Sequence, residues 1–170
     1  QHKAVDIRQG KQRGYLGIIL DYLIKDKVKI DMMQYIADII QEFPEKNNED
    51  DTAMYPANED LFGQKKDGKV KLNKDTAETF HTFVSKGLFL AKRGHPGILP
   101  TIAFLCTQVK DSSDIDGKKL KQLIKYLNNT RDEILTLGTD NLNVIKWFVD
   151  ASFAVHPNYK SHTGGTMPIV

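Results

Sequence analysis

The sequence has 170 residues, of which 40% are hydrophobic and 27% are charged, and its formal net charge is +2. This composition is that of an ordinary globular protein and allows a sizeable core. The net charge is too small to indicate nucleic-acid binding by itself, so any such function depends on how the charges are distributed. The single cysteine, Cys106, excludes an intrachain disulfide and a cysteine-pair zinc finger.

No apolar run approaches the roughly 20 residues that a membrane-spanning helix needs, so the sequence predicts no membrane association. The chain begins with the polar residue Gln1 in place of methionine, and its start shows no signal peptide. It ends in the apolar run Met167–Val170. Both ends therefore predict an internal fragment of a longer protein.

The first segment, residues 1–44, predicts a β-hairpin followed by a helix. Strand-forming residues fill 15–22, and 28–30 alternates apolar and polar residues after a polar break. The helix is expected at about 32–43, with Asp31 as its N-cap. Its apolar face consists of Met32, Ile36, Ile39, Ile40 and Phe43.

The second segment, residues 45–74, predicts a long loop. An acidic, asparagine-rich run is followed by a basic run that contains Gly68, and neither shows a helical or a strand pattern. Two apolar groups, Met54–Pro56 and Leu61–Phe62, are expected to anchor this loop to the rest of the protein.

The third segment, residues 75–131, predicts three helices. The first spans about 76–93 and begins near Asp75 or Thr76, the second begins at Pro100, and the third spans about 115–129. Their inward positions are Phe80, Val84, Gly87, Leu88 and Ala91 in the first, Ile102, Leu105, Cys106 and Val109 in the second, and Leu120, Leu123, Ile124 and Leu127 in the third.

The last segment, residues 142–170, changes to an alternating pattern. Residues 142–154 predict a strand, and 163–166 is expected to begin its partner strand. One face of the first strand carries Ile145, Trp147, Val149, Ala151 and Phe153, and the other carries Lys146, Phe148, Asp150 and Ser152. The predicted fold class is therefore α+β, with an N-terminal β-hairpin, a helical bundle and a C-terminal β-hairpin.

The C-terminal strand belongs to a longer motif. Residues 147–153 read Trp-Phe-Val-Asp-Ala-Ser-Phe, and His156, Pro157 and the Ser-His-Thr-Gly-Gly of 161–165 follow. This pattern resembles the start of the RNase H domain in Ty1/copia-type retrotransposon polyproteins. The resemblance implies that the C-terminal hairpin begins an RNase H-like sheet. Without the resemblance, Asp150 would be interpreted as a solvated or capping residue.

The resemblance also implies a role for Asp150 in metal binding. In enzymes of this class two Mg²⁺ ions support cleavage, and Asp150 would be the first of the several carboxylates that hold them. The other carboxylates of that set would follow Val170. One carboxylate cannot hold two metal ions, so the chain alone is expected to be inactive.

A second motif lies near the start of the chain. Tyr15-Leu16-Gly17 is similar to the aromatic-Leu-Gly strand that forms the primer grip in reverse transcriptases of the same class. The resemblance implies that Tyr15, Leu16 and Gly17 support the 3′ end of the growing strand, with Gly17 permitting close approach of the backbone. The alternative is a glycine in an ordinary strand.

Two helical motifs extend the resemblance in the same order along the chain. Residues 80–98 are similar to a helix that ends in an Arg-x-x-Pro-Asp-Ile turn, with Gly97 in place of the aspartate. Residues 126–130 are similar to a Tyr-Leu-x-Gly-Thr ending, with Asn129 in place of the glycine. Gly97, together with Pro100 in the following helix, indicates a degraded copy or a locally altered helix start.

Two groups of basic residues are candidate contacts for backbone phosphates. One lies on and just after the last predicted helix: Lys118, Lys121, Lys125 and Arg131. The other precedes the primer-grip motif: Arg8, Lys11 and Arg13. The alternative for both groups is an ordinary solvated surface.

We therefore expect a piece of a retrotransposon Pol polyprotein that contributes to RNA-directed DNA polymerase and ribonuclease H activity. The resemblance implies an RNA/DNA primer–template duplex and the remainder of the polyprotein as partners, no membrane, and a place in cytoplasmic virus-like particles and in the nucleus. The alternative is a non-catalytic helical protein, derived from such an element, that binds nucleic acid or another protein.

Overall fold

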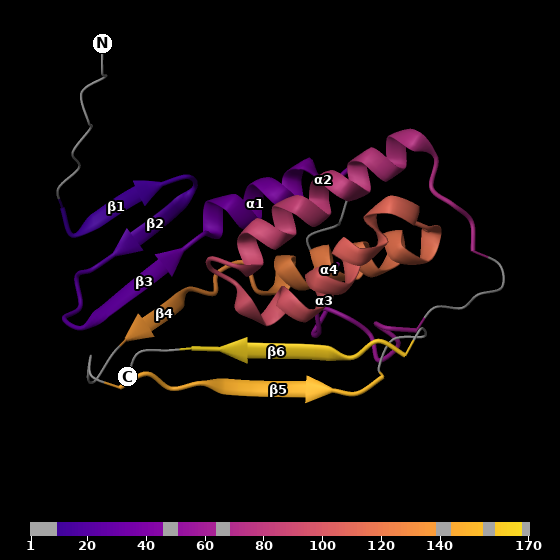
Figure 1. Ribbon diagram of the computed structural model, residues 1–170. Coiled ribbons are helices and arrows are strands. Elements are labelled where there is room, and N and C mark those ends of the chain that lie inside the picture. Colours follow the sequence, from indigo (N-terminus) through magenta and orange to yellow (C-terminus); the bar gives the residue numbers. More distant parts are fainter. Residues whose placement is uncertain (1–9, 46–50, 64–68, 139–143, 155–158, 168–170) are drawn as a thin grey trace, which may run out of the picture.

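The computed structural model describes residues 10–45, 51–63, 69–138, 144–154 and 159–167. These residues form a mixed α+β fold with four α-helices and two antiparallel sheets. Figure 1 shows the larger sheet at one end of the helical part and the smaller sheet beside it. In this described part of the chain, no helix combines the length and the apolar character that crossing a membrane requires.

The larger sheet has four strands in the order β1-β2-β3-β4, and each neighbouring pair is antiparallel. The strands are β1 (Gln12–Tyr15), β2 (Ile18–Asp21), β3 (Lys27–Asp31) and β4 (Leu135–Gly138). One face carries Ile18, Leu20 and Ile30, which lie in or against the apolar core. This face joins the sheet to the helices.

The sheet corrects the expected N-terminal hairpin in two ways. Residues 15–22 do not form one strand, because the chain reverses at Leu16 and Gly17. Strand β4 was not predicted at all, and it pairs with β3 from the far side of the helical segment. Four residues give too short an alternation to be recognised, and their strand conformation depends on a partner about a hundred residues away.

All four predicted helices are confirmed. They are α1 (Met33–Glu42), α2 (Lys74–Ala91), α3 (Leu99–Gln108) and α4 (Asp114–Asn129), and short 3₁₀ turns at Pro96–Ile98 and Val109–Asp111 flank α3. Every inward position predicted for them is buried or packs against one apolar core. Phe83, Leu90 and Phe104 are also buried, although the sequence pattern did not mark them.

The helix starts depend on polar side chains near their first turns. The N-cap of α1 is Met32, so Asp31 was wrong as its cap by one residue, although Asp31 Oδ1 accepts a hydrogen bond from the Met33 amide at 2.8 Å. The N-cap of α2 is Asn73, whose Oδ1 accepts a hydrogen bond from the Thr76 amide at 2.9 Å. Asp75 and Thr76 were therefore wrong as its caps. Helix α4 begins with a buried Ser113–Asp116 capping box.

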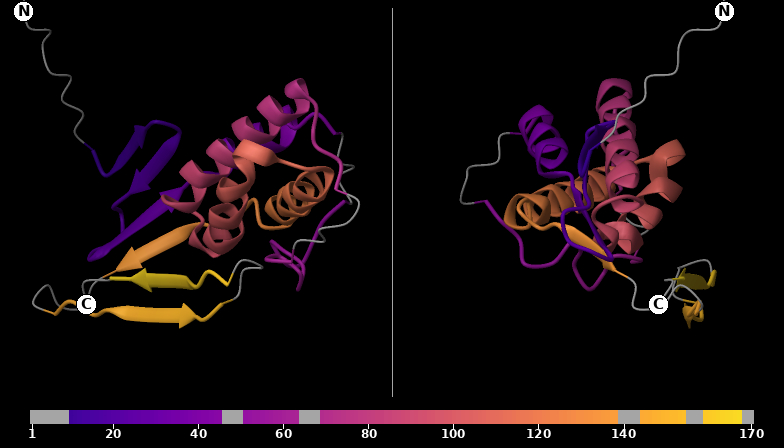
Figure 2. Two further views of the ribbon diagram at one scale, coloured as in Figure 1. Left: turned by 45° about the vertical axis from the view of Figure 1, so that its right-hand side comes forward. Right: turned by 90° about the vertical axis from the view of Figure 1, so that its left-hand side faces the viewer.

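The smaller sheet is the predicted C-terminal hairpin. It pairs β5 (Phe148–Ser152) with β6 (His162–Thr166), and Asp150 lies opposite Gly164. Both views of Figure 2 show this hairpin outside the helical part. The β5 side chains are exposed on both faces. Its assignment to an RNase H-like sheet stays a prediction.

Helix α2 approaches its neighbours closely at two glycines. A Cβ atom at Gly87 would lie 2.4 Å from Ile102 Cδ1 in α3, well inside van der Waals contact. A Cβ atom at Gly94, in the turn after α2, would lie 2.7 Å from Met32 Sδ. By contrast, nothing lies within 4 Å of a Cβ atom at Gly117 in α4.

We expect Gly87→Ala to lower the free energy of unfolding by about 1–2 kcal/mol, because overpacking against Ile102 outweighs the better helix propensity of alanine. The control Gly117→Ala is expected to raise it by up to about 1 kcal/mol, because only the propensity changes there. Urea unfolding followed by circular dichroism measures both. An increase in both variants would contradict the close approach of α2 to α3.

His95 links the end of α2 to the end of α4. Its Nε2 lies 3.1 Å from Thr130 Oγ1, and the Thr130 hydroxyl donates to the Tyr126 carbonyl at 2.9 Å. Since that hydroxyl has one proton to donate, Nε2 of a neutral His95 is the donor to Thr130. Burial lowers the pKa of His95, and the nearby Glu133 carboxylate only partly opposes this shift.

Folding stability is therefore expected to fall on acidification. The unfolded chain takes up a proton on His95 near the ordinary pKa of about 6.5, whereas the folded protein resists this protonation. The contribution of His95 to the free energy of unfolding is therefore fully present above about pH 6.5 and decreases below it. His95→Gln should be less stable at pH 7.5, and its difference from the parent should narrow at pH 5. The same change at exposed His81 is the control, and equal pH profiles for all three proteins would contradict this account.

Candidate functional site

The turn between β1 and β2 lies beside the start of α1 (Figure 1) and coincides with the primer-grip motif. We call Tyr15, Leu16 and Gly17 the hairpin tip. Leu16 has φ 50° and Gly17 has φ 77°, so both central residues of this two-residue turn have positive φ, as a type I′ turn requires. Asparagine and glycine are the usual residues there, which is why a leucine gave no turn signal.

The hairpin tip combines exposure with backbone strain. The Tyr15 and Leu16 side chains are 66% and 63% exposed. A leucine with positive φ is strained by roughly 1–2 kcal/mol, because its Cβ approaches the following carbonyl oxygen. The tip thus holds a large apolar side chain in water and in an unfavourable conformation. Strain of this kind is typical of functional positions.

The tip rests on the first helix. A Cβ atom at Gly17 would lie 3.5 Å from Cδ2 of Tyr35 in α1, so the turn is in contact with this ring. The Tyr35 hydroxyl donates to the Lys86 carbonyl of α2 at 3.4 Å. Burial raises the pKa of Tyr35, with Arg93 opposing and Glu42 adding to the shift. Tyr35 was not predicted as a site residue, because its sequence position indicates only an aromatic ring in the first turn of α1.

Basic residues accompany β1. Arg13 is two residues before Tyr15 on the same strand, so both lie on one face of the sheet. Its guanidinium carbon is 5.9 Å from the centre of the Tyr22 ring, and its Nε donates to the Gly10 carbonyl at 3.0 Å. Lys11 precedes it and is exposed. Arg8 lies outside the described residues.

The four basic residues predicted on and after the last helix all lie beside carboxylates. Lys121 pairs with Glu45, and the Nζ–Oδ distance from Lys125 to Asp51 is 2.6 Å. The distances are longer for the pairs Lys118–Asp114, at 3.6 Å, and Arg131–Asp132, at 3.8 Å. A phosphate would have to compete with these carboxylates. Phosphate binding by this group stays a prediction.

Two of those carboxylates come from the predicted loop. Residues 51–63, which we call the strap, lie along α4 without forming a helix or a strand. The Ala53 amide donates to the Lys125 carbonyl at 3.3 Å, and the Gln122 side chain donates to the Tyr55 carbonyl at 3.1 Å. Of the two predicted anchors, Leu61–Phe62 is confirmed, whereas Met54 and Tyr55 are exposed.

Lys119 is the main polar anchor of the strap. Its Nζ donates to the Leu61 carbonyl at 2.7 Å and to the Gly63 carbonyl at 2.9 Å, and it lies 4.6 Å from the centre of the Phe104 ring. Burial lowers the pKa of this ammonium. The apolar pattern of the sequence did not indicate this role for Lys119. The available signal was its position four residues before the buried Leu123, which places it beside the inward face of α4.

Asp150 lies in the middle of β5 and is exposed. Its Oδ1 accepts a hydrogen bond from the amide of the next residue, Ala151, at 2.9 Å. Throughout the described ranges, no three His, Cys, Asp or Glu side chains come together in a group that could hold a metal ion. These residues alone therefore do not fit a pair of Mg²⁺ ions, which needs several carboxylates.

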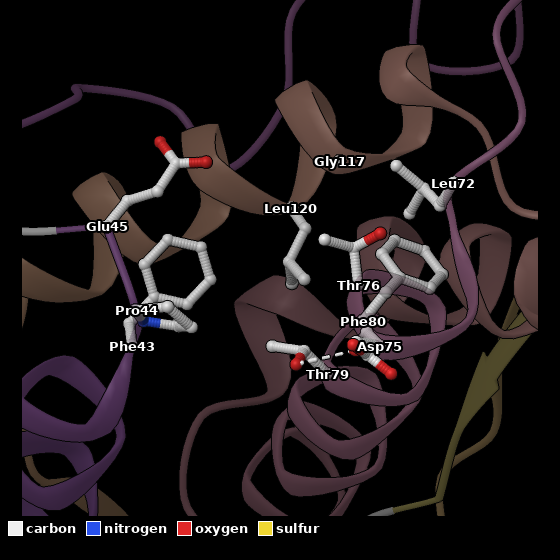
Figure 3. A pocket seen from close by; sticks show the side chains of 10 residues that line it. All are labelled: Phe43, Pro44, Glu45, Leu72, Asp75, Thr76, Thr79, Phe80, Gly117 and Leu120. Atoms are coloured by element: carbon white, nitrogen blue, oxygen red, sulfur yellow. Dashed lines mark hydrogen bonds between the residues drawn. The ribbon is translucent and has the colours of Figure 1, made fainter.

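A pocket lies between the end of α1 and the starts of α2 and α4. This pocket has a volume of about 290 Å³. Figure 3 shows Leu120 between the rings of Phe43 and Phe80. The Thr79 hydroxyl already donates to the Asp75 carbonyl at 3.0 Å. The remaining rim groups include the carboxylates of Glu45 and Asp75. Apolar walls beside two carboxylates suit an apolar ligand and disfavour phosphate.

Comparison of the chain with protein-family models, with curated proteins and with solved structures gave no match.

We expect Lys119→Met to release the strap, because two carbonyl groups lose a charged donor, and to lower the free energy of unfolding by about 1–3 kcal/mol. Hydrogen exchange of peptides from residues 53–63 should become faster. Lys118→Met is the matched control one position earlier, where an exposed ion pair is worth at most about 1 kcal/mol. Unchanged exchange in Lys119→Met would show that the strap is held by other contacts.

Proposed function

We propose that this chain supports the primer–template duplex in a reverse transcriptase of the Ty1/copia retrotransposon type, with the hairpin tip as its point of contact. The observation that carries the proposal is Leu16, an exposed leucine in a left-handed conformation beside an exposed tyrosine. The motif that resembles the primer grip therefore falls on a turn that is strained at Leu16. Its backbone and side chains are open to a partner.

The chemistry of the tip suits a nucleic-acid strand end. Tyr15 offers a flat ring for stacking on a base, and such stacking tolerates any base sequence. Leu16 offers an apolar surface for a sugar or base edge. Arg13, on the same face as Tyr15, adds a positive charge that backbone phosphates favour. A contact of this kind supports the duplex without reading its sequence.

In this proposal Asp150 is one corner of an RNase H-type metal site. It is exposed on a hairpin that lies outside the helical part, where carboxylates from a continuing sheet would have room to approach (Figure 2). A pair of Mg²⁺ ions bound there would activate water and stabilise the leaving oxygen. The residues described here hold only one of the groups required, so we assign no catalytic step to them.

A second candidate function is a non-catalytic interaction protein derived from such an element. The observation that favours it is the apolar surface of the C-terminal hairpin, where Trp147 is 68% and Phe153 is 90% exposed. Exposed apolar groups of this size mark sites of contact with other proteins. This candidate predicts that nucleic-acid binding, if any, does not depend on the hairpin tip.

The test is binding of the chain to a fluorescent RNA/DNA hybrid at low salt. Tyr15→Ser should weaken binding by about tenfold or more, because one stacked base contributes about 1–3 kcal/mol. Leu16→Asn should also weaken binding, while its free energy of unfolding rises by up to about 1 kcal/mol as the strain is relieved. A gain in stability with a loss of binding separates a functional role from a folding defect.

The control is Leu23→Asn, which makes the same chemical change in the exposed loop at the other end of β2. It should bind the hybrid like the parent chain. Equal binding by the parent and both tip variants would overturn the tip as the contact. Cleavage of the hybrid by the parent chain with Mg²⁺ would overturn the conclusion that its metal site is incomplete.

A further inference from the structure

Arg93, just after the C-terminal end of α2, is connected to the hairpin tip by a continuous set of aromatic contacts. The turn at Gly17 contacts the edge of the Tyr35 ring at Cδ2. The centre of that ring is 5.2 Å from the centre of the Phe89 ring. The guanidinium carbon of Arg93 lies 3.9 Å from the centre of Phe89 on α2. These contacts bring the end of α2 beside the start of α1, as Figure 1 also shows.

The guanidinium is held in place but is not neutralised by its neighbours. Stacking on Phe89 restrains it, and its Nη1 donates to the Phe89 carbonyl at 3.4 Å. A planar guanidinium with further N–H groups directed to solvent is suited to bind phosphate oxygens. Within the described ranges, no ion pair of Arg93 with a carboxylate occurs. Glu42, whose carboxylate adds to the raised pKa of Tyr35, is paired with Lys86.

This arrangement differs from that of the basic residues of α4. There, Lys121 and Lys125 lie against Glu45 and Asp51, so their charge is largely offset before any ligand arrives. Arg93 carries its charge on a side chain that is already ordered. Ordering a long side chain on binding reduces affinity, and a preordered one avoids most of that loss.

We propose that Arg93 is a phosphate contact for the same nucleic-acid strand that the hairpin tip supports. The inference rests on the proposed function and adds a second point of attachment to it. The strand would run along this side of the molecule, with its end at Leu16 and a backbone phosphate at Arg93. Binding through Arg93 would be insensitive to base sequence and sensitive to salt.

The test is the salt dependence of RNA/DNA hybrid binding by the parent chain and by Arg93→Gln. Loss of one phosphate contact should reduce the slope of log affinity against log salt by about 0.9. Between 50 and 200 mM salt, the affinity of the parent should therefore fall about 3.5-fold more than that of the variant. Arg93→Lys keeps the charge and should keep most of the slope, while binding more weakly because the stacked planar group is lost.

The control is Lys74→Gln, which removes one exposed charge at the opposite end of α2. Its slope should stay close to that of the parent. Equal slopes for Arg93→Gln and Lys74→Gln would overturn the inference. If the tip variants weaken binding and Arg93→Gln keeps the parent slope, the inference fails while the proposed function stands. If the parent chain does not bind the hybrid at low salt, the proposed function fails and the inference fails with it.

Discussion

The close packing of α2 is the constraint on which the rest of the structure depends. At Gly87 the helix comes so near to α3 that Ile102 occupies the space of a side chain, and at Gly94 the following turn meets Met32 in the same way. Met32 lies between β3 and α1, so this contact fixes the sheet to the helices. A larger residue at either position would require the Ile102 or Met32 side chain to shift, which a packed core resists.

The position of α2 also decides where the two candidate surfaces lie. Its N-terminal end, with Asp75 and Phe80, forms one wall of the apolar pocket. Its C-terminal end places Phe89 and Arg93 beside Tyr35 and the hairpin tip. One end is therefore apolar with carboxylates at its rim, and the other is aromatic with an ordered cation. The N-terminal end of α2 therefore favours an apolar ligand, and its C-terminal end favours an anionic one.

Sequence patterns predicted the helical part well because it depends on local information. The inward faces of all four helices follow a 3.6-residue period, which can be recognised within a short stretch of sequence. The sheet depended on distant information: β4 is a strand because β3 lies beside it. The caps at Asn73 and Ser113 fell just outside the apolar pattern that was used to set the helix starts. The missed strand thus reflects a distant partner, whereas the missed caps reflect polar residues that an apolar pattern does not register.

The candidate site shows the same division. The primer-grip motif identified Tyr15, Leu16 and Gly17 as a group, but their role as a turn required the register of β1 and β2. The lysines of α4 were recognised by spacing, yet their carboxylate partners Glu45 and Asp51 come from outside the helix. A sequence shows where charges are, and only the fold shows which of them are offset.

The hairpin tip gives the strongest argument for function because folding alone does not favour its sequence. A two-residue turn with positive φ at both positions is most stable with asparagine or aspartate before glycine. Leu16 replaces that residue with one that is strained in this conformation and that stays 63% exposed to water. Apolar residues usually stabilise a fold by leaving water. A residue that brings strain and little burial is better explained by a contact with a partner than by the stability of the chain.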